Sequence, residues 1–166
     1  MIETGVEIGQ ATEADLEGIL ELQDANQIAD GGSLSARLPR SQIIAMMSVM
    51  PLLVTRRNGR VVGFLMTSTS AMNADIPIIR AMLAAYPGAD DAYVYGPICI
   101  DTAERGKGLA QAMFAELRCL QPGREGILFI RRDNTASLRA HEKMGMREVA
   151  SFDFRGVDHA VFSYFG

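Results

Sequence analysis

A short run of basic residues and glycines at positions 105–108 (RGKG) has the composition of a phosphate-binding turn. The apolar stretch before it, residues 93–100, is expected to form a strand, and the sequence after it, up to Leu120, a helix. The first N–H groups of a helix lack intrahelical partners and carry the positive end of the helix dipole, so they accommodate an anion. Glycines let a phosphate approach the backbone, and the basic side chains add charge. The stretch therefore predicts an anion site.

Two common phosphate loops do not fit this run. A Walker loop needs Ser or Thr after its Gly-Lys pair, whereas Lys107 is followed by Gly108 and Leu109. A dinucleotide fingerprint counted from Gly106 needs Gly or Ala at the position that Gln111 occupies. Both classes of nucleotide site are therefore excluded.

The pattern that remains is Arg105-x-x-Gly108-x-Ala110. It resembles the Gln/Arg-x-x-Gly-x-Gly/Ala loop of the GNAT superfamily of acetyl-CoA-dependent N-acetyltransferases. A tight strand-to-helix turn without a ligand is the alternative interpretation of this loop.

A second segment, residues 134–146 (NTASLRAHEKMGM), strengthens the resemblance. Asn134 is a good N-cap and Gly145 a good left-handed helix stop. The segment resembles the second GNAT signature, in which an asparagine opens a helix that ends in a Tyr-Glu-Lys-x-Gly-Phe-like sequence. Two positions depart from it: His141 stands where many members have tyrosine, and Met146 where most have phenylalanine. Methionine adapts to a core position, so only the histidine bears on the chemistry.

The resemblance implies that the chain binds acetyl-CoA as cosubstrate, without a metal, and transfers the acetyl group to a primary amine by direct attack. It implies that backbone groups of one strand hold the pantetheine and polarise the thioester carbonyl, and that the basic loop takes the pyrophosphate. Two residues of the second signature contact the cofactor from the other side. The expected cofactor-binding residues are Ile98, Ile100, Arg105, Gly106, Lys107, Gly108, Leu109, Ala110, Asn134 and Ser137.

His141 is the expected catalytic residue. By the resemblance it protonates the departing thiolate, and its reference pKa of about 6.5 suits neutral pH better than the value of about 10 for a phenol. Packing against Met146 is an equally weighted alternative. Tyr95 and Asp101 lie in the right neighbourhood for a general base, although a carboxylate elsewhere, acting through water, would serve equally.

The acceptor is expected to be an amine of a small molecule or a peptide. Its site should involve the loop of residues 27–40 and the inserted helical segment of residues 71–88, whose apolar stripe fits core packing or a lid. Asp24 and Asp30 could attract a cationic amine or be solvated surface. Two other functions stay open: a non-catalytic acyl-CoA-binding sensor or partner domain, and an acyltransferase that uses a longer acyl-CoA or a protein N-terminus.

The order of the expected elements extends the resemblance to the whole chain, which we expect to form a single domain, 1–166. The fold class is α/β (α+β), with a mixed, mainly antiparallel sheet of six to seven strands flanked by four to five helices. The most secure local signal is Asn58-Gly59, the dipeptide preferred in two-residue hairpin turns. A strand that contains Gly96-Pro97 should bulge or part from a neighbour there. The last two strands, residues 147–154 and 160–164, should be joined by a turn at 156–159.

Composition and charge limit the other classes of protein to which the chain could belong. A net charge of −4 argues against a nucleic-acid-coating surface. The longest apolar stretch, residues 43–54, is too short and too interrupted to cross a membrane, and the first ten residues lack the basic and apolar segments of a secretory signal. Cys99 and Cys119 give neither a disulfide framework nor metal-ligand spacing, and buried thiols in a reducing cytoplasm are expected. A homodimer is an open alternative for the assembly.

Overall fold

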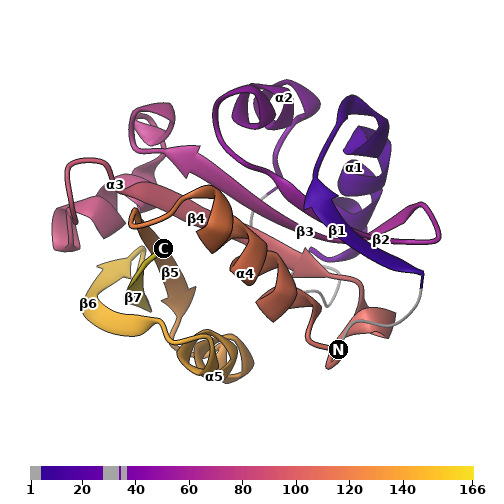
Figure 1. Cartoon of the computed structure of the whole chain (residues 1–166). Coiled ribbons are helices and arrows are strands. Elements are labelled where there is room, and N and C mark those ends of the chain that lie inside the picture. Colours follow the sequence, from indigo (N-terminus) through magenta and orange to yellow (C-terminus); the bar gives the residue numbers. More distant parts are fainter. Residues whose placement is uncertain (1–4, 28–33, 35–36) are drawn as a thin grey trace. The chain divides into compact units, whose positions relative to one another are not determined.

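A computed structural model describes residues 5–27, 34 and 37–166, which form seven strands and five α-helices. The strands form one sheet in the order β1-β2-β3-β4-β5-β7-β6 (Figure 1). They are β1 (Val6–Gln10), β2 (Leu53–Arg57), β3 (Arg60–Thr69), β4 (Tyr93–Ile100), β5 (Glu125–Arg131), β6 (Arg147–Phe154) and β7 (Val157–Phe165). The helices are α1 (Leu16–Ala25), α2 (Arg40–Val49), α3 (Pro77–Ala85), α4 (Leu109–Leu120) and α5 (Thr135–Lys143). The expected fold class is confirmed, with β4 and β5 parallel and the pairs β1–β2, β2–β3, β5–β7 and β6–β7 antiparallel.

The chain divides into two compact units. Unit 1 comprises Met1–Thr67 and Gly96–Leu120, and unit 2 comprises Ser68–Tyr95 and Gln121–Gly166. Strands β3 and β4 both continue along the chain from one unit into the other. Because two strands are shared in this way, a single folding domain remains our proposal.

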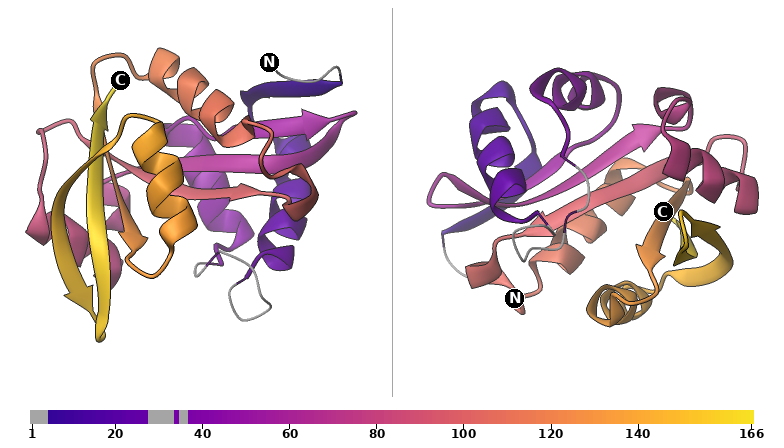
Figure 2. Two further views of the ribbon diagram at one scale, coloured as in Figure 1. Left: turned by 90° about the horizontal axis from the view of Figure 1, so that it is seen from below. Right: turned by 180° about the vertical axis from the view of Figure 1, so that it is seen from behind.

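Unit 1 is built on the strands β1, β2 and β3. Helices α1 and α2 lie on one face of these strands and α4 lies on the other (Figure 1 and Figure 2). Strands β2 and β3 are joined by the expected two-residue turn, in which Asn58 has φ 51° and Gly59 has φ 82°. Both values are the left-handed ones that this turn requires. The turn fixes the register of the hairpin, with Arg57 opposite Arg60.

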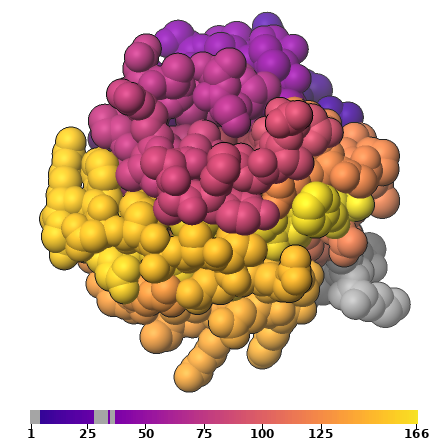
Figure 3. All heavy atoms as spheres, turned by 90° about the vertical axis from the view of Figure 1, so that its left-hand side faces the viewer, coloured from indigo at the N-terminus to yellow at the C-terminus, as the bar shows by residue number. Residues whose placement is uncertain are grey.

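Unit 2 consists of the C-terminal strands, α3 and α5. Figure 3 shows the segment that contains α3 lying against the β6–β7 hairpin. The apolar stripe of α3 belongs to the core of this unit and is not a lid: Ile79 and Met82 are buried, and Ile76 and Leu83 pack against them. The other buried members of this core are Ala92, Val94, Ile127 and Val161.

The turn between β6 and β7 differs from the expected one. It is a two-residue turn at Arg155 and Gly156, with φ 52° and 80°, and β7 already begins at Val157. Residues 157–159 are therefore strand. Arginine is not a usual residue for a left-handed turn position, so no residue type in this segment indicates that the turn begins at Arg155.

The pairing of strand β4 with β5 ends where the proline was expected to interrupt it. Tyr93 and Val94 pair with Gly126 and Ile127 of β5, and this pairing ends before the Gly96-Pro97 peptide, which is cis. At the end of β4, the Asp101 N–H donates to the Val62 carbonyl, 2.8 Å away. This second half of β4 leads into the basic loop.

Both cysteines are free thiols. Cys99 on β4 is buried, and burial raises its pKa to about 12. Cys119 on α4 is exposed, so the expectation of two buried thiols is wrong for this residue. The sequence placed Cys119 on the helix correctly but not on its solvent face.

A buried carboxylate, Glu125, joins three parts of unit 2. Its side chain accepts hydrogen bonds from the Tyr86 hydroxyl, 2.7 Å away, from the Ala89 N–H, 2.7 Å away, and from the Ser163 hydroxyl. Burial acts to raise the pKa of Glu125, but the hydrogen bonds outweigh this effect and the pKa is lowered. The ionised carboxylate thus fixes the end of the α3 segment to β5 and β7.

Glu125→Gln is expected to lower the free energy of unfolding at pH 7 by about 1–3 kcal/mol, since hydrogen bonds to a charged acceptor are weakened. Because the folded pKa lies below the unfolded value, this contribution is present above about pH 4.3 and is lost as the pH falls through the folded pKa. Urea unfolding at a series of pH values measures the difference. Glu116→Gln, at an exposed position of α4, is the control and should stay within about 0.5 kcal/mol. An effect of Glu125→Gln that persists undiminished at pH 3 would contradict the charge-based account.

Candidate cofactor-binding and catalytic residues

The basic loop has the backbone of an anion site. It lies between a short 3₁₀ turn, Thr102–Glu104, and α4, and its glycines have left-handed φ values, 78° at Gly106 and 79° at Gly108. A Cβ at Gly106 would meet no atom within 4 Å, so backbone conformation rather than crowding favours glycine. Helix geometry leaves the first N–H groups of α4, from Leu109, without intrahelical partners. The glycines have the conformation that the predicted anion site requires, and phosphate binding by this loop stays a prediction.

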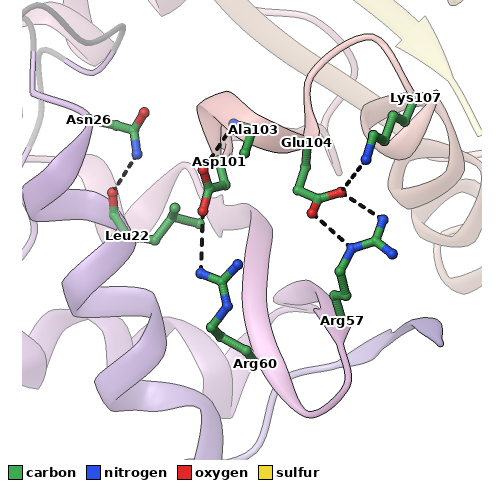
Figure 4. A network of polar contacts seen from close by, with 8 residues as sticks. All are labelled: Leu22, Asn26, Arg57, Arg60, Asp101, Ala103, Glu104 and Lys107. Carbon is green, nitrogen blue, oxygen red and sulfur yellow. Dashed lines mark hydrogen bonds and ion pairs between the residues drawn. The ribbon is translucent and has the colours of Figure 1, made fainter.

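The two basic side chains of the loop make different contacts. Arg105 donates to the Ile100 carbonyl and to the Asn26 side-chain oxygen, each 3.3 Å away. The Lys107 Nζ lies 3.2 Å from a carboxylate oxygen of Glu104 (Figure 4). Arg57 holds the same carboxylate with two hydrogen bonds, which was not foreseen from the sequence. One of the two expected phosphate-binding cations is therefore part of an ion-pair network.

The residues expected to hold pantetheine lie on the second half of β4. Ile98 and Ile100 are half-buried, with buried Cys99 between them. The carbonyl of Ile100 accepts the Arg105 hydrogen bond, so this group holds the loop in position. Unit 1 thus brings together Ile98, Ile100 and residues 105–110 of the expected site.

Unit 2 brings together the expected residues of the second signature. Asn134 is the N-cap of α5, as predicted: its side-chain oxygen accepts a hydrogen bond from the Ser137 N–H, 3.2 Å away. One turn later, His141 Nδ1 lies 2.8 Å from the Ser137 carbonyl and 3.2 Å from the Ser137 hydroxyl. Asn134, Ser137 and His141 therefore lie along one face of α5.

His141 is held by hydrogen bonds at both ring nitrogens. A carbonyl only accepts, so Nδ1 must carry a proton for Ser137. Nε2 lies 3.2 Å from the Tyr95 hydroxyl, and in the neutral ring it accepts the hydrogen bond. Burial lowers the pKa of His141, and the Ser137 carbonyl opposes this lowering only in part. Near pH 7 the neutral imidazole is favoured, with no proton on Nε2 to give away.

Tyr95 is equally enclosed. Its side chain is buried, and burial raises the pKa of its hydroxyl well above the usual value. Its ring contacts His141 edge to face, with centroids 5.6 Å apart, and Tyr164 in the same manner at 5.8 Å. The hydroxyl is therefore a hydrogen-bond donor to His141, and Tyr95 and His141 form one unit.

The other acidic candidates have structural partners. Asp101 caps the 3₁₀ turn by accepting from the Ala103 N–H, 3.1 Å away, and lies 3.4 Å from Arg60. Asp24 forms an exposed ion pair with Arg37, 3.4 Å apart. Asp30 lies outside the described residues, as does most of the predicted acceptor loop.

Solved structures with the same fold define the class of protein. A GNAT acetyltransferase from Streptococcus agalactiae is 19% identical, with a TM-score of 0.73, over 98% of this chain and 96% of that one. A ribosomal-protein-alanine N-acetyltransferase from Brucella melitensis is 22% identical, with a TM-score of 0.68, over 96% and 99%. A phosphinothricin acetyltransferase from Sinorhizobium meliloti, solved with acetyl-CoA, is 20% identical, with a TM-score of 0.66, over 98% and 89%. These likenesses establish an acetyltransferase fold.

The family follows from the sequence itself. The model of the acetyltransferase (GNAT) family matches residues 33–146, which is more than half of the chain, and the chain belongs to this family. It is an acetyl-CoA-dependent N-acetyltransferase by class. No curated protein matches the chain by sequence.

Among the described residues, no cluster of three His, Cys, Asp or Glu side chains could hold a metal ion. The helices of the described chain include none that is long and apolar enough to span a membrane.

Proposed function

We propose that this chain acetylates a primary amine of a small molecule or a peptide, and that the cofactor pyrophosphate binds the loop of residues 105–110. The observation that carries the proposal is the pair of left-handed glycines in front of α4, since the first N–H groups of this helix and two basic residues belong to one short segment. The main chain at Ile98 and Ile100 is proposed to bind the pantetheine, and Asn134 and Ser137 to contact the same cofactor.

The proposed reaction is a direct transfer. The amine nitrogen forms a bond to the acetyl carbon, the bond from that carbon to sulfur breaks, and the amine loses a proton. We propose that His141 acts in this proton transfer with Tyr95: the tyrosine oxygen takes the proton of the amine as its own proton passes to Nε2. The thiolate then takes a proton from water, and the hydroxide so formed takes the proton from Nε2, which restores the neutral imidazole. The neutral ring, its fixed Nδ1 proton and the hydrogen bond from Tyr95 support a base more than an acid.

The amine acceptor could be a peptide or a small molecule, and the similar structures include an example of each. One of those proteins is named for acetylating an alanine of a ribosomal protein, another for acetylating phosphinothricin, a small molecule. Release of free thiol from acetyl-CoA should be measured with amino acids, polyamines, aminoglycosides and peptides. We expect at least one amine to accelerate it. An acyl-CoA series of increasing chain length then tests the preference for acetyl.

Tight binding of acetyl-CoA without acceleration by any amine would favour a non-catalytic sensor or partner domain. Faster release from a longer acyl-CoA would favour a different acyltransferase. Both outcomes would leave the cofactor loop in place and change only the reaction.

A further inference from the structure

A buried carboxylate immediately precedes the proposed phosphate loop. Glu104 ends the 3₁₀ turn, only 7% of its side chain is exposed, and the loop begins at the next residue. A negative charge at this place should repel the pyrophosphate, because a poorly hydrated charge is screened little. The loop can therefore hold an anion only if this charge is offset.

Arg57 makes the closest contacts with this carboxylate. From the end of β2, 47 positions earlier in the chain, its Nε and Nη2 lie 2.8 and 2.7 Å from the two oxygens of Glu104 (Figure 4). Lys107 is the second partner, at 3.2 Å. The hydrogen bonds from Arg57, followed by those from Lys107, lower the pKa of Glu104 to about 2, so the carboxylate stays ionised at neutral pH.

The charges of these three groups determine the sign of the net charge next to the loop. Two cations and one carboxylate leave one net positive charge. Without Arg57, Glu104 and Lys107 would cancel, and Arg105 would be the remaining cation of the loop. The bidentate fork of Arg57 also holds this largely buried carboxylate in a fixed orientation.

We infer that Arg57 is a positioning residue for acetyl-CoA binding: its guanidinium offsets the Glu104 carboxylate, so that the charge of Lys107 acts on the cofactor pyrophosphate. This inference rests on the proposed role of the loop. It adds a residue from a distant hairpin, which acts on the loop through the Glu104 carboxylate.

Arg60 provides a matched control. It faces Arg57 across the same hairpin and has the same charge, but it lies 3.4 Å from Asp101 instead of Glu104, and 65% of its side chain is exposed (Figure 4). Replacing either arginine by methionine removes one positive charge from the same part of the molecule. Only Arg57→Met leaves the Glu104 charge without its main partner.

The test is calorimetric titration with CoA, with 3′-dephospho-CoA and with S-acetylpantetheine, which lacks the pyrophosphate. Arg57→Met should lower the affinity for CoA and for dephospho-CoA about 10-fold and change the affinity for S-acetylpantetheine little. Arg60→Met should change the affinity for each of the three ligands by no more than about twofold. Adding Glu104→Gln to Arg57→Met should restore the affinity for CoA to within about threefold. A merely structural role would not be rescued, because the contact stays broken.

Unchanged CoA affinity in Arg57→Met would overturn the inference, as would equal losses in the two arginine variants or equal losses for S-acetylpantetheine. If Arg57→Met does not fold, Arg57→Lys and Glu104→Gln provide the test instead. Both variants keep the summed charge of positions 57, 104 and 107 positive, so wild-type or tighter CoA binding is expected. A tenfold loss of CoA affinity in either variant would contradict the inference. Gly108→Asp distinguishes failure of the proposed phosphate loop from failure of the proposed role of Arg57. Wild-type CoA affinity in that variant removes the loop itself, whereas a loss there with none in Arg57→Met removes only the role of Arg57.

Discussion

Gly108→Asp is expected to weaken acetyl-CoA binding by about 100-fold, as measured by calorimetric titration. Gly108 directly precedes α4, so a carboxylate there would compete with the pyrophosphate for the first N–H groups and repel it. Its φ of 79° also adds backbone strain of about 1–2 kcal/mol for any residue with a Cβ. Gly108→Asn, which has a similar shape and tolerates this φ, should lose less affinity.

The strain needs its own control. Gly123 has φ 71°, is exposed, and a Cβ there would meet no atom within 4 Å. Gly123→Asp should therefore lose similar stability and keep the affinity for acetyl-CoA. Equal affinities in the two aspartate variants would mean that the loop does not bind the pyrophosphate.

His141→Phe is expected to lower turnover by about 10²- to 10⁴-fold and to change acetyl-CoA affinity little, because the loss falls on proton transfer. Tyr95→Phe removes the other half of the hydrogen bond and should lose a similar factor. If the two residues act as one unit, the double variant should be no slower than either single variant. Steady-state rates with an accepted amine provide the measurement.

The free energy of unfolding provides an independent test of the hydrogen bond between Tyr95 and His141. His141→Phe removes one hydrogen-bond partner of the buried Tyr95 hydroxyl, which should reduce the free energy of unfolding by about 1–3 kcal/mol. The double variant removes both polar partners and should recover part of this loss. A His141→Phe enzyme of wild-type rate would eliminate a catalytic role and leave His141 a packing residue.

The pH profile separates a base from an acid. If the neutral imidazole is the active form, the rate should rise as the pH passes upward through the pKa of His141, which burial holds below about 6.5. A proton donor would show the opposite sign, since the imidazolium is lost over the same range. His141→Phe should abolish whichever limb belongs to this residue.

The parts of the fold that the sequence predicted are those with local signals. Asn58-Gly59 specifies a turn through two adjacent residues, and Asn134 caps a helix by bonding a residue three positions later. The basic loop is of the same kind, because its glycines act through their own φ angles. Each signal lies within a few residues, so no knowledge of the rest of the chain is needed.

The contacts that the sequence did not predict join distant positions. Tyr95 and His141 are 46 residues apart, and Arg57 and Glu104 are 47 apart. An arginine at a strand end and a glutamate before a glycine turn have no pattern that would pair them, since the pairing depends on how the strands are ordered. The tautomer of His141 likewise depends on a carbonyl and a hydroxyl that only the folded chain brings to its ring.

The exposed turn at Asn58-Gly59 bears on how the purified protein ages. Asparagine before glycine loses its side-chain amide by succinimide formation more readily than before other residues, because glycine hinders the attacking backbone nitrogen least. The product adds a carboxylate between Arg57 and Arg60, the two arginines that hold Glu104 and Asp101. Stored samples should therefore lose cofactor affinity as this modification accumulates, and mass spectrometry of the hairpin peptide would show when a preparation is no longer fit for binding measurements.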